Sequence, residues 1–187
     1  MQLGKMFILH FLMQSILNLF KFDKNMKLKI KVKELTKGCM PNIIEKGDWI
    51  DLICAEDMKL NITTLEDNPD VKYIPLGVAM QLPKGFEAIV APRSSTPSRF
   101  GIMCANSFGV IDNCYCGNTD EWKFPVVTIR PTFIVKGCRI CQFKIQLSQK
   151  ATWWQKLKWL FSSGVKLVKV DNLQENSRGG FGSTGVK

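Results

Sequence analysis

The sequence is poor in the residues from which metal centres and disulfide frameworks are built. It has a single histidine, His10, and its seven cysteines form an odd set without the regular spacing of a disulfide framework. That usage predicts a reducing, cytoplasmic compartment. Cys114 and Cys116 together with Cys138 and Cys141 suggest a thiolate zinc site. However, an odd separation places Cys138 and Cys141 on opposite faces of a regular strand. We therefore interpret the cysteines as small apolar residues.

Acidic residues are scarce near both ends of the chain. The formal net charge is +10, and residues 136–170 hold eight Lys or Arg and no acid. Residues 1–38 hold eight Lys against Asp23 and Glu34. A basic surface attracts polyanions such as DNA or an anionic membrane. We interpret the charge as a solvated basic face and expect no stable nucleic-acid binding, because aromatic and basic residues alternate only near residues 153–159.

No hydrophobic run is long enough to span a membrane. Residues 6–20 are mostly apolar, but polar residues interrupt them and no small-residue cleavage site follows. Two interpretations stay open for residues 1–25: an amphipathic leader, or an extension upstream of a true start at Met26. We favour the second, because Leu28, Ile30 and Val32 begin a clean alternation there, which is typical of a half-buried strand.

Short strands separated by Gly and Pro dominate the rest of the chain, and 45% hydrophobic residues exclude wholesale disorder. This pattern predicts an all-β sandwich or barrel. We expect one β domain over residues 26–175, followed by a glycine-rich tail over 176–187. Strands are predicted at residues 26–33, 49–54, 77–82, 86–91, 126–130, 139–147 and 165–170.

Helical spacing appears only in an insertion at residues 151–164. Its apolar residues lie opposite three polar ones. The apolar set is Trp153, Trp154, Leu157, Leu160 and Phe161, and the polar set is Gln155, Lys156 and Lys158. We expect an amphipathic helix docked on the protein's own surface. Contact of residues 151–163 or 6–20 with a membrane is the less favoured alternative, as is contact of the helix with a partner.

The tail from Arg178 to Gly185 cannot hold a regular strand or helix, because glycine has the largest backbone entropy to lose. It can instead close over a ligand, offering backbone N–H groups and hydroxyls to phosphate oxygens while Phe181 covers a flat ring. Three further motifs precede it, at residues 92–95, 106–117 and 137–142. In this order, the motifs resemble those of the homotrimeric dUTPase (deoxyuridine 5′-triphosphate nucleotidohydrolase) family.

The resemblance implies a jelly-roll or β-barrel domain with a small helical insertion and a flexible C-terminal lid. It implies Mg²⁺-assisted hydrolysis of dUTP to dUMP and pyrophosphate by attack of water on the α-phosphorus, which limits uracil in DNA and supplies dUMP. It also implies a homotrimer with shared active sites. Two alternatives remain: a dCTP deaminase of the same fold, and a nucleotide-gated regulatory or binding protein.

Residues Gly109–Asp112, followed by Tyr115 and Gly117, predict a strand, a turn and a returning strand. The mouth of such a β-hairpin exposes backbone groups that can read the edge of a base. By the resemblance, the hairpin with Gly109, Val110 and Ile111 binds uracil and Asn106 helps to read it. Asp112 is the general base, and Tyr115 packs under the deoxyribose and excludes a ribose.

The remaining site residues follow from the other motifs of the family. Asp51 acts through water on Mg²⁺, although Trp49 stands where the family usually has a glycine. Substrate binding falls to a larger set, with the tail covering uracil and the outer phosphates: Arg93, Ser94, Ser95, Gln142, Arg178, Phe181, Gly182, Ser183 and Thr184. Because alternation would place Arg139 on the face opposite Gln142, we assign Arg139 to a structural or inter-subunit ion pair.

Overall fold

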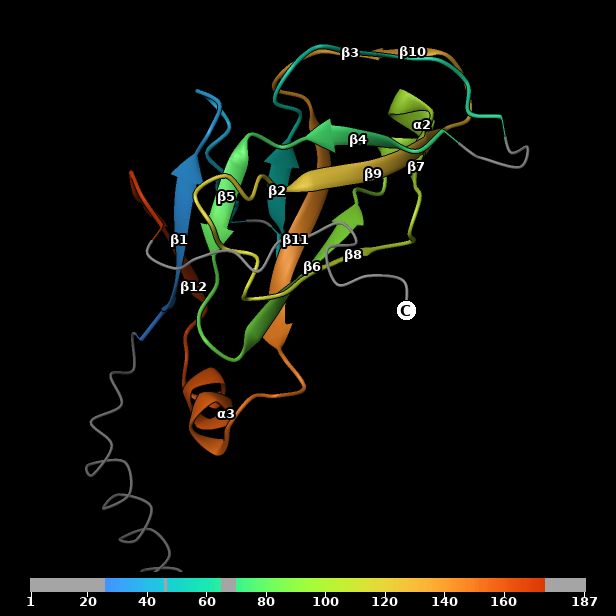
Figure 1. Cartoon of the computed structure of the whole chain (residues 1–187). Helices are drawn as coiled ribbons and strands as arrows, with labels where there is room; N and C mark the ends of the chain where they lie inside the picture. Colours follow the sequence, from blue (N-terminus) through green and yellow to red (C-terminus); the bar gives the residue numbers. More distant parts are fainter. Residues whose placement is uncertain (1–25, 46, 65–69, 174–187) are drawn as a thin grey trace, which may run out of the picture.

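The structure, a computed structural model, describes residues 26–45, 47–64 and 70–173. Residues 1–25 and the predicted substrate-binding residues of the tail, Arg178, Phe181, Gly182, Ser183 and Thr184, lie outside this part of the chain. The described residues form strands and two short helices (Figure 1). The predicted all-β jelly-roll architecture with a helical insertion is confirmed.

Seven strands lie close to where the sequence predicts them. They are β1 (Leu28–Glu34), β2 (Ile50–Ile53), β5 (Val78–Gln81), β6 (Phe86–Pro92), β9 (Lys123–Thr128), β11 (Arg139–Leu147) and β12 (Val165–Lys169). The predicted insertion forms α3 (Trp153–Leu160), and the first strand of the predicted hairpin is β8 (Gly109–Ile111). Elements that the sequence did not predict complete the fold: β3 (Met58–Leu60), β4 (Lys72–Pro75), α2 (Thr96–Phe100), β7 (Ile102–Cys104) and β10 (Thr132–Ile134). Most of these are too short to show a hydrophobic period.

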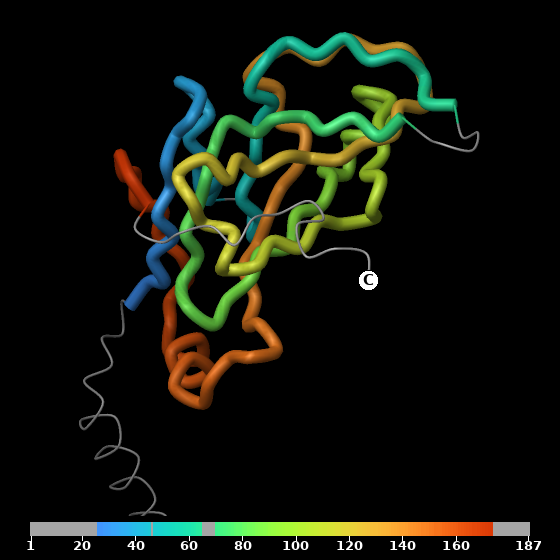
Figure 2. Tube along the Cα trace, viewed as in Figure 1, coloured from blue at the N-terminus to red at the C-terminus, as the bar shows by residue number. Residues whose placement is uncertain are grey.

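Four small sheets share one core. Their strand orders are β12-β1-β5, β10-β3, β2-β11-β6-β8 and β4-β9-β7. All pairings are antiparallel except β1 with β12. The long strand β11 lies between β2 and β6, so it joins the region where β2 and β6 end to the region where α3 begins (Figures 1 and 2).

The core is filled by alternating side chains from these strands. Leu28, Ile30 and Val32 of β1 are at most 1% exposed, as their alternation predicts. The largest buried side chain is Trp122, whose ring packs edge-on against Phe143 of β11 at 5.2 Å between centroids. Burial of such apolar surface, at about 25 cal/mol per Å², is the main stabilising contribution.

The prediction that the chain returns after Asp112 as a second strand of a hairpin is wrong. Strand β8 pairs with β6, and residues 112–122 form turns before β9 begins. Local contacts explain this course: the Asp120 carboxylate accepts a hydrogen bond from the Gly117 N–H at 2.7 Å. The chain then enters the core at Trp122 instead of returning beside β8.

The helix α3 forms inside the predicted insertion and begins with a capping box. The Thr152 side chain accepts from the Gln155 N–H, and the Gln155 side chain accepts from the Thr152 N–H. The expected docking on the protein's own surface is confirmed in part: Trp159 packs against Phe86 and Leu157 is half-buried, but no residue of α3 is fully buried. Trp153, Trp154 and Leu160 are 66%, 59% and 72% exposed.

Candidate active site

An open hollow of about 420 Å³ lies where β2 and β11 pair and β6 ends. Asp51, Arg93 and Gln142 line it together, which brings three of the predicted site residues to one place. Its other lining residues are Ile44, Gly47, Asp48, Trp49 and Arg139. The hollow therefore combines carboxylates, guanidinium groups and an amide.

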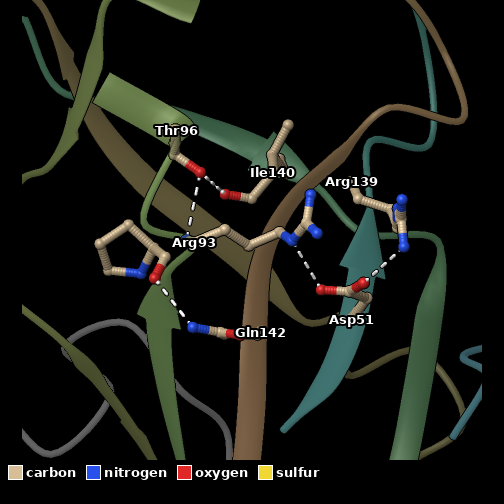
Figure 3. Close-up of polar contacts among 7 residues, drawn as sticks. Asp51, Arg93, Thr96, Arg139, Ile140 and Gln142 are labelled. Atoms are coloured by element: carbon tan, nitrogen blue, oxygen red, sulfur yellow. Dashed lines mark hydrogen bonds and ion pairs between the residues drawn. The ribbon is translucent and has the colours of Figure 1, made fainter. Parts of the chain in front are cut away.

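The carboxylate of Asp51 is the centre of this arrangement (Figure 3). Its Oδ1 lies 2.8 Å from Arg93 Nε, and its Oδ2 lies 3.0 Å from Arg139 Nη1. Asp51 is only 8% exposed, so its charge needs such partners. An isolated Asp in this sequence context would be interpreted as a surface or turn carboxylate. Asp51 is instead buried and paired with two arginines.

The opposite-face assignment of Arg139 is wrong, because β11 contains a bulge. Arg139 pairs with Ile53 and Cys141 with Leu52, so Ile140 is an extra residue in the strand. The bulge shifts the alternation by one, and Arg139 and Gln142 both reach the hollow. The predicted ion pair of Arg139 exists, and it forms with Asp51 of the same chain.

Because of the same bulge, the odd separation of Cys138 and Cys141 no longer implies that they lie on opposite faces of a strand. Both contact the hydrophobic core, Cys141 fully buried and Cys138 in part. All seven cysteines are free thiols. Burial raises the pKa of Cys54 to about 11 and that of Cys141 well above its usual value, so both thiols stay protonated near neutral pH. Among the described residues, no group of three or more His, Cys, Asp or Glu could hold a metal directly.

Thr96, which the sequence analysis missed, positions Arg93. Its fully buried hydroxyl donates to the carbonyl of Ile140, the bulge residue, at 2.7 Å. It also accepts from the Arg93 N–H at 3.1 Å. The backbone at the bulge and the backbone of Arg93 are thus joined through one side chain (Figure 3). Thr96 follows Arg93-Ser-Ser directly, which is the only signal that the sequence offers.

Gln142 and Trp49 complete the walls of the hollow. The Gln142 amide donates to the carbonyl of Pro92 at 3.3 Å and so holds the end of β6. Trp49 lies beside β11, where the Lys144 ammonium stands 5.0 Å from the centre of its ring. This contact accommodates the large indole at a position where the family usually has a glycine. Ser94 and Ser95 are exposed at the start of α2.

The segment predicted to read the base, Asn106 to Tyr115, does not line the hollow. Along β6, Val90 pairs with Gly109 and Ala88 with Ile111, so Asp112 continues away from Arg93. Arg93 lies five steps beyond Ala88, the partner of Ile111, and Asp112 lies one step further in the other direction; six steps of about 3.3 Å give about 20 Å along the strand. One chain therefore does not bring Asp112 to the hollow, whereas Asn106 through Tyr115 form one continuous segment whose residues are half-buried or exposed.

Two side chains of this segment are held by local contacts. The Tyr115 hydroxyl donates to the carbonyl of Glu121 at 3.0 Å, which fixes the ring, and burial raises the pKa of Tyr115. The Asn106 side-chain carbonyl accepts from the Cys104 thiol at 3.1 Å. Ser107 has a positive φ of 64°, which lets the chain turn sharply before β8.

Comparison with known proteins gives a consistent family. A model of the dUTPase family matches residues 51–158. The SPbeta prophage-derived deoxyuridine 5′-triphosphate nucleotidohydrolase YosS of Bacillus subtilis is 45% identical over 162 residues, covering 87% of this chain and all of that protein. The deoxyuridine 5′-triphosphate nucleotidohydrolase of Rickettsia rickettsii is 34% identical over 165 residues, covering 86% of this chain and 97% of that protein.

Solved structures agree on the fold. The dUTPase of Streptococcus mutans superposes with a TM-score of 0.54 at 21% identity, covering 61% of this chain and 89% of that one. A mutant dUTPase of Staphylococcus bacteriophage 80alpha, solved with dUpNHpp, gives 0.53 at 21% identity and covers 84% of this chain and 98% of that one. A mutant dUTPase from phage phi11 of S. aureus, whose structure reveals a structural Mg(II) ion, gives 0.54 at 16% identity over 66% of this chain and 93% of that one.

Proposed function

The chain belongs to the dUTPase family and hydrolyses dUTP to dUMP and pyrophosphate, and we propose that its active site is shared between the chains of a homotrimer. In this proposal the hollow around Asp51, Arg93 and Gln142 receives the triphosphate. The segment from Asn106 to Tyr115 comes from a second chain and brings the base-reading edge and Asp112. The observation that carries the proposal is the separation of about 20 Å between Asp112 and Arg93 along β6.

The hollow is suited to a polyphosphate. The ion pair with Asp51 uses Nε of Arg93, and a guanidinium has four further N–H donors for phosphate oxygens. Ser94 and Ser95 directly follow Arg93 in the chain and are exposed, and their hydroxyls would serve as further donors. The ion pair with Asp51 and the hydrogen bond to Thr96 hold Arg93 in place before substrate arrives. Arg93 therefore loses little conformational freedom on binding, and the entropy cost of binding is small.

The donors also fit Mg²⁺ held through water. Mg²⁺ prefers oxygen ligands and keeps several of its waters. Asp51 uses one acceptor position on each oxygen for the two arginines, and a carboxylate offers about four such positions. Asp48 contributes a second carboxylate to the same hollow. When bound, the ion would neutralise charge on the triphosphate, while Asp51 and Asp48 would accept hydrogen bonds from its waters.

The chemical step needs one base and one oriented water. Asp112 takes a proton from the water, whose oxygen attacks the α-phosphorus. The bond from that phosphorus to the bridging oxygen breaks, and pyrophosphate leaves. The backbone edge of Gly109, Val110 and Ile111 and the Asn106 side chain read uracil, and the Tyr115 ring leaves no space for a 2′-hydroxyl. In the tail, Phe181 would stack on uracil while Arg178, Gly182, Ser183 and Thr184 would hold the outer phosphates.

No helix among the described residues is both long and apolar enough to cross a bilayer. The seven free thiols favour a reducing compartment, and we assign the reaction to the cytoplasm on that basis.

Mixing two inactive variants tests both parts of this proposal. Asp112→Asn keeps the shape of the carboxylate but removes the base, and we expect turnover to fall by roughly 10²–10⁴-fold while dUTP still binds. Arg93→Ala removes the phosphate contact. After the two are refolded together in equal amounts, we expect about a quarter of the wild-type activity, because each of two positions carries the competent chain in about half of the trimers.

The outcomes separate function from assembly. A wild-type chain that releases no pyrophosphate from dUTP, with dCTP, dTTP and UTP assayed in parallel, would refute the activity. An active wild type whose mixed variants stay inactive would show that Asp112 and Arg93 act from one chain. The double variant Asp112→Asn/Arg93→Ala, mixed with wild type, is the control for refolding yield.

A further inference from the structure

Helix α3 presents its apolar side to solvent. Contacts with the protein body come from another side of the helix: the Trp159 ring lies 5.4 Å from that of Phe86, and the Gln155 amide fills the space beside Gly85. Residues three and four apart share one helix face, so Trp153, Leu157 and Leu160 form a stripe on the side away from Gln155 and Trp159, with Leu157 half-buried. Trp153 and Leu160 in this stripe are about two-thirds exposed or more.

Lysines flank this stripe and acids are missing. At 100° per residue, Lys156 borders the Trp153–Leu160 stripe on one side, and Lys158 lies beyond Trp154 on the other. Lys150 and Lys166 lie just before and after the helix, and all four lysines are exposed. Within the described residues, none of the four makes an ion pair. No Asp or Glu occurs between residues 136 and 170.

The helix also stands at one end of the molecule. It projects where β1 and β12 begin, away from β3 and β10 (Figures 1 and 2). Strand β11 separates it from the hollow, and eight steps from Arg139 to Leu147 correspond to about 26 Å. A convex, protruding helix can meet a flat surface without rearrangement of the site.

We propose that α3 docks the protein on an anionic membrane surface. Tryptophan and leucine side chains would enter the boundary between headgroups and acyl chains, while the lysine ammonium groups reach the headgroup phosphates. Charge favours this occupant over an apolar protein groove, because each lysine near an anionic leaflet adds attraction that a neutral surface lacks. Binding by one short helix is reversible, and several copies in one assembly strengthen it.

Vesicle sedimentation tests the proposal with the full chain. We expect the protein to sediment with vesicles of phosphatidylglycerol and phosphatidylcholine, to bind pure phosphatidylcholine vesicles far less, and to release at high salt. Trp153→Ser/Leu160→Ser should weaken binding about tenfold or more through lost apolar contact. Lys156→Glu/Lys158→Glu should weaken it by a similar factor through reversed charge.

Matched controls use the same substitutions elsewhere. Ile62 is 57% exposed, and Lys37 and Lys59 are exposed at positions outside α3. Ile62→Ser and Lys37→Glu/Lys59→Glu should bind vesicles like the wild type. Retained circular dichroism and dUTP hydrolysis in every variant would show that the fold survives.

Three results would overturn the proposal. The first is absence of binding to the anionic vesicles. The second is wild-type binding by both α3 variants, which would place the contact in residues 1–25 or in general charge. The third is equal binding to neutral vesicles or an equal loss in the controls, since either outcome would remove the specific role of the lysine-flanked helix.

Discussion

At the scale of single residues, the site depends on side chains whose partners lie far away in the sequence. Asp51 contacts Arg139, which is 88 positions further on, and Thr96 bonds to the carbonyl of Ile140. Without Thr96, the buried carbonyl of Ile140 would lose its side-chain partner, and leaving such a group unpaired costs about 1–3 kcal/mol. The geometry of the hollow is therefore set by a few pairs rather than by one motif.

Two substitutions of Tyr115 test separately the hydrogen bond that anchors its ring and the proposed selection of the sugar by that ring. Tyr115→Phe removes only the hydroxyl that donates to the Glu121 carbonyl, so we expect a stability loss of about 1 kcal/mol and continued exclusion of UTP. Tyr115→Ala removes the ring and should admit UTP. Steady-state kinetics with dUTP and UTP, together with thermal unfolding, measure both effects. Exclusion of UTP by the Ala variant with normal dUTP turnover would assign sugar selection to another residue.

At the scale of elements, one extra residue in β11 decides which side chains form the site. The bulge at Ile140 turns Arg139 toward Asp51 and leaves a carbonyl that Thr96 satisfies. Strand β12 is tied in a different way: Glu34 at the end of β1 pairs with Lys169 of β12 and accepts from the N–H groups of Gly38 and Met40. The parallel β1–β12 pair thus carries an ion pair at its end.

The Glu34 contacts make this edge sensitive to acid. The hydrogen bond from Lys169, followed by that from Gly38, lowers the pKa of Glu34 below its usual value of 4.5. A lowered pKa in the folded state means that the contribution to stability is complete above pH 4.5 and is lost as the pH falls through the folded-state pKa. We expect Glu34→Gln to unfold more easily than wild type at pH 7, with the difference vanishing at strongly acidic pH.

Urea titrations of both proteins across this pH range measure the effect. Glu87→Gln is a matched control, because the side chain of Glu87 accepts from Gln146 on the edge of a different sheet and no lysine pairs with it in the described residues. A constant difference between Glu34→Gln and wild type down to acidic pH would show that Glu34 acts by packing and not by charge.

At the scale of the whole molecule, the separate positions of Asp112 and Arg93 lead us to expect that catalysis needs assembly of several chains. The tail is expected to close this shared site. Deleting residues after Asn176 should leave the trimer folded, because every described core strand ends before that point. We expect turnover to fall severely and affinity for dUTP to fall more than affinity for dUMP, since stacking of Phe181 contributes about 1–3 kcal/mol by analogy with base stacking and dUMP lacks the outer phosphates.

Light scattering and nucleotide titration of the truncated protein check this. Normal dUTP hydrolysis by the truncated trimer would refute the lid, and an active monomer at high dilution would refute the shared site. Phe133→Ala, an exposed aromatic outside the tail, serves as the control for a general loss of apolar surface.

The sequence alone determined the strands with clear alternation, the helical insertion and the family. Leu28, Ile30 and Val32 alternate because one face of β1 is buried, and the capped helix at Thr152 follows from local spacing. These features depend on neighbours in the chain, and local preference therefore suffices to predict them.

Only the tertiary structure decided the direction of α3, the course after Asp112 and the place of Arg139. A helical period fixes which residues share a face, but contacts with Gly85 and Phe86 decide which face turns inward. The bulge at Ile140 likewise arises from pairing with β2, and burial of Trp122 draws the chain away from a returning strand. Each outcome depends on contacts with residues far away in the chain. The hydrophobic periodicity of a local segment does not predict such contacts.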